Sequence, residues 1–294
     1  MENKNTLMQG KIILVTGATD GIGKITAREL AKMGATTIIA GRNPEKTART
    51  VMEIREASGN PNVDLLVGDL SSQADVRRVT AEFNQHYDRL DVLVNNAGAY
   101  FMKRAESVDG IEMTFALNHL GYFLLTHLLL DALKAGSPAR IVNVSSAAHL
   151  GARLNLNDLE MKSGFSGWGA YAQSKLANLL FTYELSRQLG GQGITVNALH
   201  PGFVDTNFGV SNGGLGGMLM SLFQKVGAIS PEEGSQTSIY LASSPEVEGI
   251  SGKYFSKKKA VGSSRISHDQ DLARALWERS LELTGLAERQ TASR

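Results

Sequence analysis

The chain has 294 residues, of which 42% are apolar and 20% charged, and its formal charge at pH 7 is +1. This composition is typical of an ordinary soluble globular protein. The near-neutral balance gives no electrostatic footprint for nucleic acid, so we expect no such partner. The absence of cysteine excludes disulfides, thiolate metal sites and cysteine nucleophiles. The six histidines show no metal-ligand spacing, so we expect no metal site.

The first ten residues are polar and lack the apolar centre of a signal peptide. Elsewhere the apolar stretches are broken well before the roughly 20 residues that a membrane-spanning helix needs. We therefore expect a cytoplasmic protein with no membrane span.

Short apolar runs recur along the chain and predict buried strands at residues 12–16, 36–40, 63–67, 90–94, 140–144, 194–198 and 252–256. Helical patterns separate or follow them at residues 21–33, 44–57, 72–87, 120–135, 231–242 and 269–284. Strands that are apolar on both faces and alternate with helices indicate a parallel sheet covered on both sides. With right-handed crossovers, this predicts an α/β, doubly wound Rossmann fold whose mainly parallel sheet has about seven strands.

No composition break, long linker or repeat divides the chain, so we expect a single domain over residues 1–294, with a frayed tail from about residue 288. Residues 208–223 are rich in Gly and Met, are nearly uncharged and lie between a predicted strand and a predicted helix. This segment is predicted to be a mobile lid whose apolar side chains line a substrate mouth, with ordinary packing as the alternative.

The first predicted strand runs directly into a glycine-rich loop at the start of a helix. Glycine lets the backbone approach a phosphate closely, and a helix N-terminus offers N–H groups and a positive dipole end to a pyrophosphate. This strand, loop and helix context favours dinucleotide binding over a plain tight turn. The expected cofactor contacts in the loop are Gly17, Thr19, Asp20, Gly21, Ile22 and Gly23.

The end of the second predicted strand bears on the choice between NADP(H) and NAD(H). An acidic residue there would bind the ribose 2′-hydroxyl of NAD, but no acid lies between Leu30 and Pro44. Arg42 can instead pair bidentately with a 2′-phosphate, with Asn43 beside it and Lys24 as a weaker second contact. The sequence therefore favours NADP(H), and the alternative is that Arg42 is a solvated surface residue.

Tyr171 and Lys175 are four residues apart and therefore share one face of a helix. A tyrosine ordinarily has a pKa near about 10, and a fixed ammonium beside the phenol favours the phenolate and lowers that pKa. We expect Tyr171 to exchange a proton with a carbonyl or alcohol oxygen near neutral pH. The alternative is an exposed pair of side chains that only pack on one another.

Several motifs occur in the order in which the short-chain dehydrogenase/reductase family has them, and the chain resembles that family over nearly its whole length. They are the loop from Thr16 to Gly23, Asn95-Asn-Ala-Gly98, Ser146, Tyr171-x3-Lys175 and Pro201-Gly202. Residues 118–126, 142–149, 199–202 and 251–256 are similar to the retinol dehydrogenase branch of the family.

The resemblance implies that Tyr171 is the general acid or base, that Ser146 donates a hydrogen bond to the substrate oxygen and that Asn118 anchors a water in the proton relay. Lys175 would hold the ribose hydroxyls and bias Tyr171. These roles agree with the needs of proton transfer and of charge developing on an oxygen. Ser145 is the rival of Ser146, and alternation along a strand sends the two side chains to opposite faces.

The resemblance also implies that Asp69 faces the adenine amino group and that Thr206 lies beside the nicotinamide carboxamide. The remaining expected cofactor contacts are Asp69, Leu70, Asn95, Ala97, Gly98, Pro201, Gly202, Val204 and Thr206, together with Tyr171 and Lys175. As alternatives, Asp69 caps the helix that begins near Ser72, and Asn95 with Asn96 serves a turn.

Together these observations predict an NADP(H)-dependent oxidoreductase that transfers a hydride between the nicotinamide and a carbonyl or alcohol substrate. A catalytically silent NADP(H)-sensing regulator is an alternative, and so is a light-driven enzyme similar to protochlorophyllide reductase, which the absence of cysteine disfavours. An apolar substrate is compatible with the predicted lid. The family resemblance further implies a homo-oligomer, through helices around residues 107–135 and 169–190.

Overall fold

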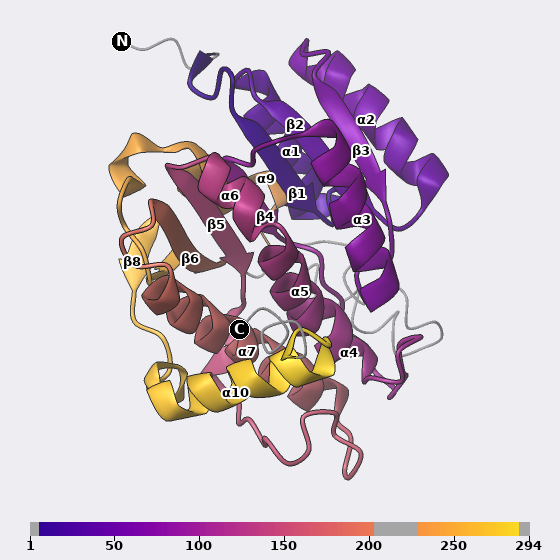
Figure 1. The fold of residues 1–294 in the computed structure, drawn as a ribbon, viewed down its shortest axis with the longest axis vertical. Coiled ribbons are helices and arrows are strands. Elements are labelled where there is room, and N and C mark those ends of the chain that lie inside the picture. The colour runs from indigo at the N-terminus through magenta and orange to yellow at the C-terminus, as the bar shows by residue number, and fades with distance from the viewer. Residues whose placement is uncertain (1–5, 203–228, 288–294) are drawn as a thin grey trace.

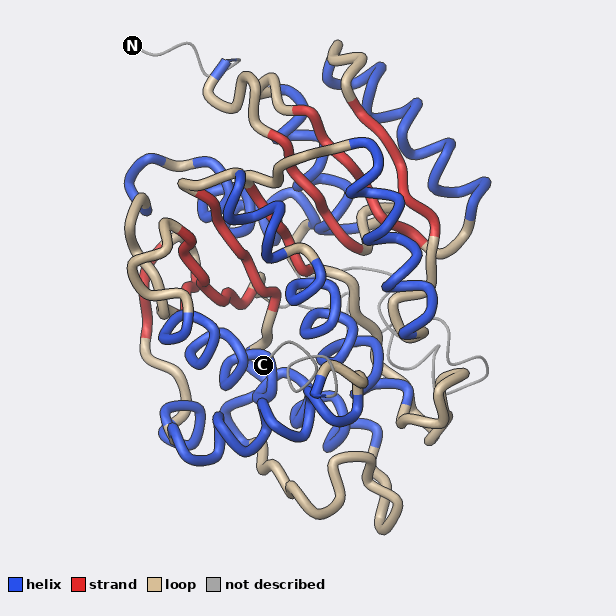
Figure 2. The backbone as a smooth tube through the Cα atoms, viewed as in Figure 1, coloured by secondary structure: helices blue, strands red, loops and turns tan. Residues whose placement is uncertain are grey.

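A computed structural model describes residues 6–202 and 229–287. Its centre is a sheet with the strand order β3-β2-β1-β4-β5-β6-β7-β8, flanked by helices on both faces (Figures 1 and 2). The predicted α/β doubly wound fold is thus confirmed. The helices of the described ranges include none that is both long and apolar enough to cross a membrane.

Seven strands of the sheet are parallel, and they match the predicted runs to within a few residues. They are β1 (Ile12–Thr16), β2 (Thr36–Gly41), β3 (Val63–Val67), β4 (Val92–Asn95), β5 (Ala139–Val144), β6 (Ile194–His200) and β7 (Tyr254–Ser256).

An eighth strand, β8 (Lys259–Val261), pairs antiparallel with β7 and was not predicted from the sequence. Lys257 and Lys258 both have positive φ, 49° and 63°, and form the two-residue turn between the strands. Positive φ at two successive residues suits the twist of a hairpin. Because β8 is three residues long and exposed, it has no apolar alternation by which its sequence could reveal it.

The helices cover the two faces of the sheet. They are α1 (Gly21–Lys32), α2 (Pro44–Ser58), α3 (Gln73–His86), α4 (Met113–Phe115), α5 (Gly121–Leu128), α6 (Leu130–Ala135), α7 (Gly167–Gln188), α9 (Pro231–Ser243) and α10 (Gln270–Leu283). A π-helical segment, η2 (Ala116–Leu120), precedes α5, and 3-10 turns occur at η3 (Ala147–Gly151), η5 (Pro245–Val247) and η6 (Arg265–His268). The helix expected over residues 120–135 is interrupted at Leu129, between α5 and α6.

Alternate side chains of β1 enter two separate apolar cores. Leu14 belongs to the core under α3, α5, α7 and α10, whereas Ile13 and Val15 belong to the core under α1, α2 and α9. All three side chains are fully buried. Burial on both faces is the reason that β1 reads as a continuous apolar run.

The order of the strands in the sheet determines where the site lies. From β1 the chain runs outward to β2 and β3 and then crosses back to β4, on the other side of β1. The loops that follow β1 and β4 therefore lie next to each other at the carboxyl edge of the sheet. In open α/β sheets, ligands bind in the crevice at such a switch point.

Candidate active site

The glycine loop after β1 packs tightly against the chain that follows β4. Gly17 has φ +62°, and a Cβ built on it would lie 2.6 Å from the Cα of Ala97. A Cβ on Gly23 would lie 2.4 Å from the Asn96 Nδ2 atom. Contact within the protein therefore already requires glycine at these two positions, in addition to any need for close approach to a phosphate.

Asn96 holds this loop in place, whereas the sequence suggested for it only a place in a turn. Its Nδ2 donates hydrogen bonds to the carbonyl oxygens of Thr16 at 2.8 Å and Gly17 at 3.1 Å. In return, the Thr16 hydroxyl oxygen accepts from the backbone N–H groups of Asn96 at 2.9 Å and Ala97 at 3.0 Å. The two strand ends are thus tied into one rigid floor, which also contains the expected contact Ala97.

Asp20 begins α1 and is engaged with the protein. Its Oδ1 accepts from the Gly21 backbone N–H at 2.8 Å, and its Oδ2 pairs with the Lys46 ammonium at 2.9 Å. Thr19 lies between this cap and β2, since a Cβ on Gly41 would meet its methyl carbon at 2.5 Å. Ile22 follows in the first turn of α1.

Arg42 directly follows β2 and is exposed, beside the start of α2. Asn43 is the N-cap of α2, because its side chain accepts from the Lys46 backbone N–H at 2.7 Å. Lys24, expected as a weaker phosphate contact, instead pairs with Glu53 at 2.5 Å. Lys46 stands closer to the α1 N-terminus through its pair with Asp20, and it is a cation that the sequence analysis missed.

Asp69 follows β3 and shapes the turn into α3. Its Oδ1 accepts from the backbone N–H and the hydroxyl of Ser71, at 2.9 and 2.7 Å. The cap of α3 is Ser72, whose hydroxyl accepts from the Asp75 N–H, so the alternative of a helix cap for Asp69 is wrong. The sequence position could have shown this, because Asp69 precedes the N-cap residue of α3 by three residues.

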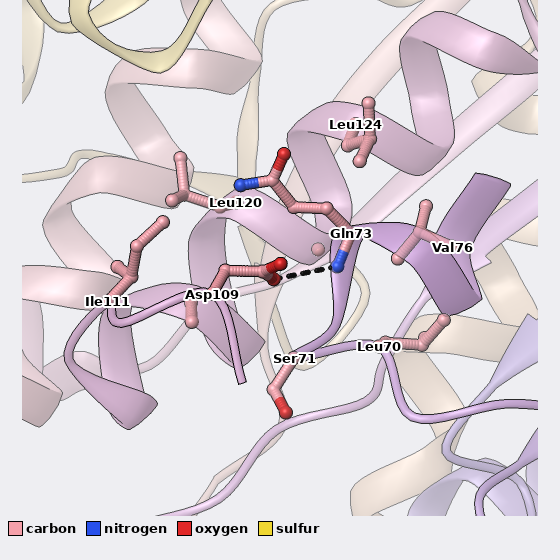
Figure 3. A pocket seen from close by; sticks show the side chains of 10 residues that line it. Leu70, Ser71, Gln73, Val76, Asp109, Ile111, Leu120 and Leu124 are labelled. Carbon is pink, nitrogen blue, oxygen red and sulfur yellow. Dashed lines mark hydrogen bonds between the residues drawn. The ribbon is translucent and has the colours of Figure 1, made fainter. Parts of the chain in front are cut away.

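Leu70 lines a small hollow between the start of α3 and the chain before α4 (Figure 3). Figure 3 shows Gln73 and Asp109 facing one another there, joined by the 2.9 Å bond from the Gln73 N–H to the Asp109 Oδ2. The cavity volume is about 10 Å³, which is room for one water. None of Ser146, Tyr171 or Lys175 lines this hollow, so it is not the substrate site.

The Asn95 side chain faces the core. It is fully buried, and its Nδ2 donates to the hydroxyl oxygen of Thr126 at 3.0 Å and to the Oδ1 of Asn143 at 2.9 Å. The Asn143 Nδ2 in turn donates to the Thr182 hydroxyl oxygen at 2.9 Å. These bonds link β4 to β5, α5 and α7, so any contact between Asn95 and a cofactor falls to its backbone.

Tyr171 and Lys175 lie on α7 and share a face, as their spacing predicts. The Lys175 Nζ lies 5.6 Å from the centroid of the Tyr171 ring and donates to the Val144 carbonyl oxygen at 3.0 Å. Ser146 follows β5, begins η3 and forms a side-chain hydrogen bond with Tyr171. The Ser145 hydroxyl points away and donates to the Lys175 carbonyl oxygen at 2.8 Å, so the structure distinguishes the two serines.

The pKa values of the pair differ from the expectation drawn from the sequence. Although part of the Tyr171 surface is accessible, surrounding protein atoms disfavour the phenolate and raise the pKa of Tyr171 to about 12, against a smaller lowering by the Ser146 hydrogen bond. Burial also lowers the pKa of Lys175 to about 7. The expected lowering for Tyr171 is not found, because loss of solvation outweighs the influence of an ammonium that is itself disfavoured.

Asn118 lies on the π-helical segment η2 and is buried. Its Oδ1 accepts from the Ala99 N–H at 2.9 Å, and its Nδ2 donates to the Ala99 carbonyl oxygen at 3.0 Å and to the Ser174 hydroxyl oxygen at 3.1 Å. Gly98 lies beside it, since a Cβ there would be 3.2 Å from the Asn118 Oδ1 and 3.5 Å from the Lys175 Nζ. Single π-turns of this kind frequently mark functional sites.

Two aromatic side chains that the sequence analysis missed flank Tyr171. The centroid of the Tyr100 ring lies 6.1 Å from that of the Tyr171 ring, in an edge-on arrangement. The centroid of the Trp168 ring also lies 6.1 Å from that of the Tyr171 ring. Trp168 is 59% exposed, and Met102, near Tyr100 in the chain, is 42% exposed. Trp168 precedes Tyr171 by three residues on one helix, which is a spacing that could have identified it.

The end of β6 completes the described part of the site. Gly202 has φ +102°, and its N–H donates to the Nδ1 of His200, on the far side of Pro201, at 3.2 Å. The expected contacts Val204 and Thr206 and the predicted lid at residues 208–223 lie outside the described residues, as does the predicted tail from residue 288. Over the part of the chain that is described, no three His, Asp or Glu side chains gather to hold a metal.

Comparison with known proteins agrees with this geometry. The family model for short chain dehydrogenase matches residues 11–213. Human "Retinol dehydrogenase 13" is 43% identical over 284 residues, which cover 94% of this chain and 85% of that protein.

Two solved structures are also similar. An uncharacterized protein from Mycobacterium paratuberculosis has a TM-score of 0.76 and 34% identity over 94% of each chain. The Pseudomonas aeruginosa RhlG/NADP active-site complex has a TM-score of 0.67 and 29% identity, covering 85% of this chain and 96% of that one. Sequence and structure together show that this chain belongs to the short-chain dehydrogenase family and is similar to retinol dehydrogenases within it.

Proposed function

We propose that this chain is an NADP(H)-dependent oxidoreductase that interconverts a carbonyl compound and its alcohol. The observation that carries the proposal is the hydrogen bond between Ser146 and Tyr171, with the Lys175 ammonium beside them at the edge of the sheet where the glycine loop lies. A bound nicotinamide would supply the hydride, which no side chain can supply.

The side chains of the site would transfer the proton that accompanies the hydride. With a pKa of about 12, Tyr171 carries its proton at neutral pH, which is the form that donates to the oxygen of a carbonyl undergoing reduction. Ser146 is placed to donate a second hydrogen bond to the same oxygen as negative charge develops on it. Lys175, with a pKa of about 7, is partly charged at neutral pH and favours the release of the Tyr171 proton.

The residues present fit a phosphorylated dinucleotide. The tight loop at Gly17 and Gly23 places the N-terminus of α1 at the sheet edge, where helix dipoles favour anions. Arg42 and Lys46 are exposed cations at the end of β2 and the start of α2, and they suit a 2′-phosphate. The similar P. aeruginosa structure is a complex with NADP, which supports this choice of cofactor.

An apolar substrate is supported by the surface around Tyr171. The exposed Trp168 ring lies beside the tyrosine, and the exposed Met102 lies against Gly167, one turn before Tyr171 in α7. An exposed tryptophan offers a large apolar face to a ligand. The name of the human relative places it with retinol, which is itself an apolar alcohol.

The decisive variant is Tyr171→Phe, which removes only the proton donor. We expect it to lose turnover by at least about 100-fold, the usual share of general acid catalysis, while NADPH binding is nearly unchanged. Turnover is measured as NADPH oxidation over a panel of aldehydes and ketones, and binding is measured by calorimetry. Tyr240→Phe, on α9 at the other face of the sheet, is the matched control.

Retained turnover in Tyr171→Phe would remove the catalytic assignment. NADPH binding with no turnover of any compound by the unaltered protein would instead favour the silent regulator.

A further inference from the structure

The Lys175 ammonium is buried with little polar compensation. The residue is 3% exposed, and the Val144 carbonyl oxygen is its hydrogen-bond acceptor. Within residues 6–202 and 229–287, no Asp or Glu forms an ion pair with it. A buried ammonium is costly unless other groups stabilise it, so the remaining neighbours of Lys175 matter.

Two aromatic rings occupy that environment. The Lys175 Nζ lies over the ring of Tyr171 at 5.6 Å from its centroid, and over the ring of Tyr122 at 5.9 Å. Tyr122 comes from α5, four residues after Asn118, and so lies on the same side of that helical run. The Val144 carbonyl oxygen from β5 and Gly98 from the chain after β4 also lie at the ammonium, and neither titrates.

The hydroxyl of Tyr122 does not account for its place beside Lys175. The side chain is 1% exposed, and its hydroxyl has no hydrogen-bond partner among the described residues. An unsatisfied buried hydroxyl costs free energy that a phenylalanine would not cost. The next residue is in fact a phenylalanine, Phe123, which packs against Trp277 in the apolar core. What Tyr122 presents to Lys175 is therefore the face of its ring, which a phenylalanine would present equally.

We propose that Tyr122 is a positioning residue, whose ring face stabilises the charged form of Lys175 beside Tyr171 through a cation–π interaction. Such contacts are formed within about 6 Å of the ring centroid, and they are strongest where water is excluded. The inference rests on the proposed function, since it says how the lysine that serves Tyr171 keeps its charge in a buried site.

The test varies the electron density of the ring at position 122 while keeping the shape of the ring nearly constant. Position 122 is filled with phenylalanine and then with its mono-, di- and trifluorinated forms, because fluorine draws electron density from the ring face. The pKa of Lys175 is read by NMR titration of isotope-labelled lysine, with Lys175→Met identifying the signal. We expect Tyr122→Phe to leave the pKa of Lys175 nearly unchanged, and each added fluorine to lower it, to a total of about one unit.

A pKa of Lys175 that stays constant across the fluorinated series would overturn the inference. A downward shift in the pKa of Lys175 in Tyr122→Leu, which removes the ring, would support the inference. An upward shift would overturn it, because desolvation by the ring would then outweigh its attraction for the ammonium. Because the titration needs neither cofactor nor substrate, its result is separate from that of Tyr171→Phe. An enzyme with full turnover and a flat series keeps the proposed function and loses the role of Tyr122.

Discussion

The ionisation of Lys175 links the proposed chemistry to the stability of the fold. Burial lowers its pKa from 10.5 to about 7 in the folded protein. Between those two values the unfolded chain binds a proton that the folded chain does not, so the free energy of unfolding rises with pH through this window. Below a pH of about 7 both states are protonated, and the full cost of burying the charge is present.

Lys175→Met should therefore flatten this pH dependence. We expect the free energy of unfolding of the unaltered protein to rise relative to that of the variant between a pH of about 7 and about 9, below the range in which tyrosines mainly titrate. Urea unfolding at several pH values measures the difference. Parallel curves for the two proteins would mean that the Lys175 pKa is the same folded and unfolded.

Arg42 sets the expected preference for the phosphorylated cofactor. Because hydrogen bonds to charged groups contribute about 1.5–3 kcal/mol, Arg42→Gln should weaken NADPH binding by about 10- to 100-fold. Binding of NADH should hardly change. Calorimetric titration with both cofactors makes the comparison.

Lys24→Gln is the matched control for Arg42→Gln, since Lys24 is paired with Glu53 and should not contribute to the preference. An equal loss of NADPH and NADH affinity in Arg42→Gln would mean that the residue acts on something other than the 2′-phosphate.

At the scale of elements, β1 shows why the sheet could be predicted so closely. Its side chains are buried on both faces, so the apolar run in the sequence is a direct record of its place in the middle of the fold. The pattern failed where burial did not decide the structure. The exposed hairpin strand β8 has no apolar record, and the interruption at Leu129 lies within an apolar stretch that reads as a continuous helix.

Burial should also decide the cost of mutation. Leu14→Ala removes a fully buried side chain from β1 and should lower the free energy of unfolding by about 2–5 kcal/mol. Val261→Ala, on β8 where the side chain is 43% exposed, should change it by no more than about 0.5 kcal/mol. Urea unfolding of both variants gives the comparison, and equal effects would contradict the expectation that burial decides the cost of mutation.

For the molecule as a whole, the sequence could predict those parts of the site that are fixed by neighbours along the chain. The glycine loop, the Tyr171 and Lys175 face and the Ser146 position all follow from a strand end or a helix spacing. Tyr122, Asn96 and the pKa of Tyr171 could not be predicted, because each depends on which distant segment lies opposite. Burial is a property of the assembled fold, and it reversed the expected shift for Tyr171.

The hydrogen-bonded series from Asn95 through Asn143 to Thr182 bears on how β4 and β5 are aligned. Asn95 and Asn143 are direct partners in the register of β4 and β5. If either strand slid by one position, both amides would be left without partners in an apolar interior, whereas an aliphatic pair could accommodate the slip. The polar pair thus fixes the register of β4 and β5. It holds the serine that follows one strand at a fixed offset from the loop that follows the other.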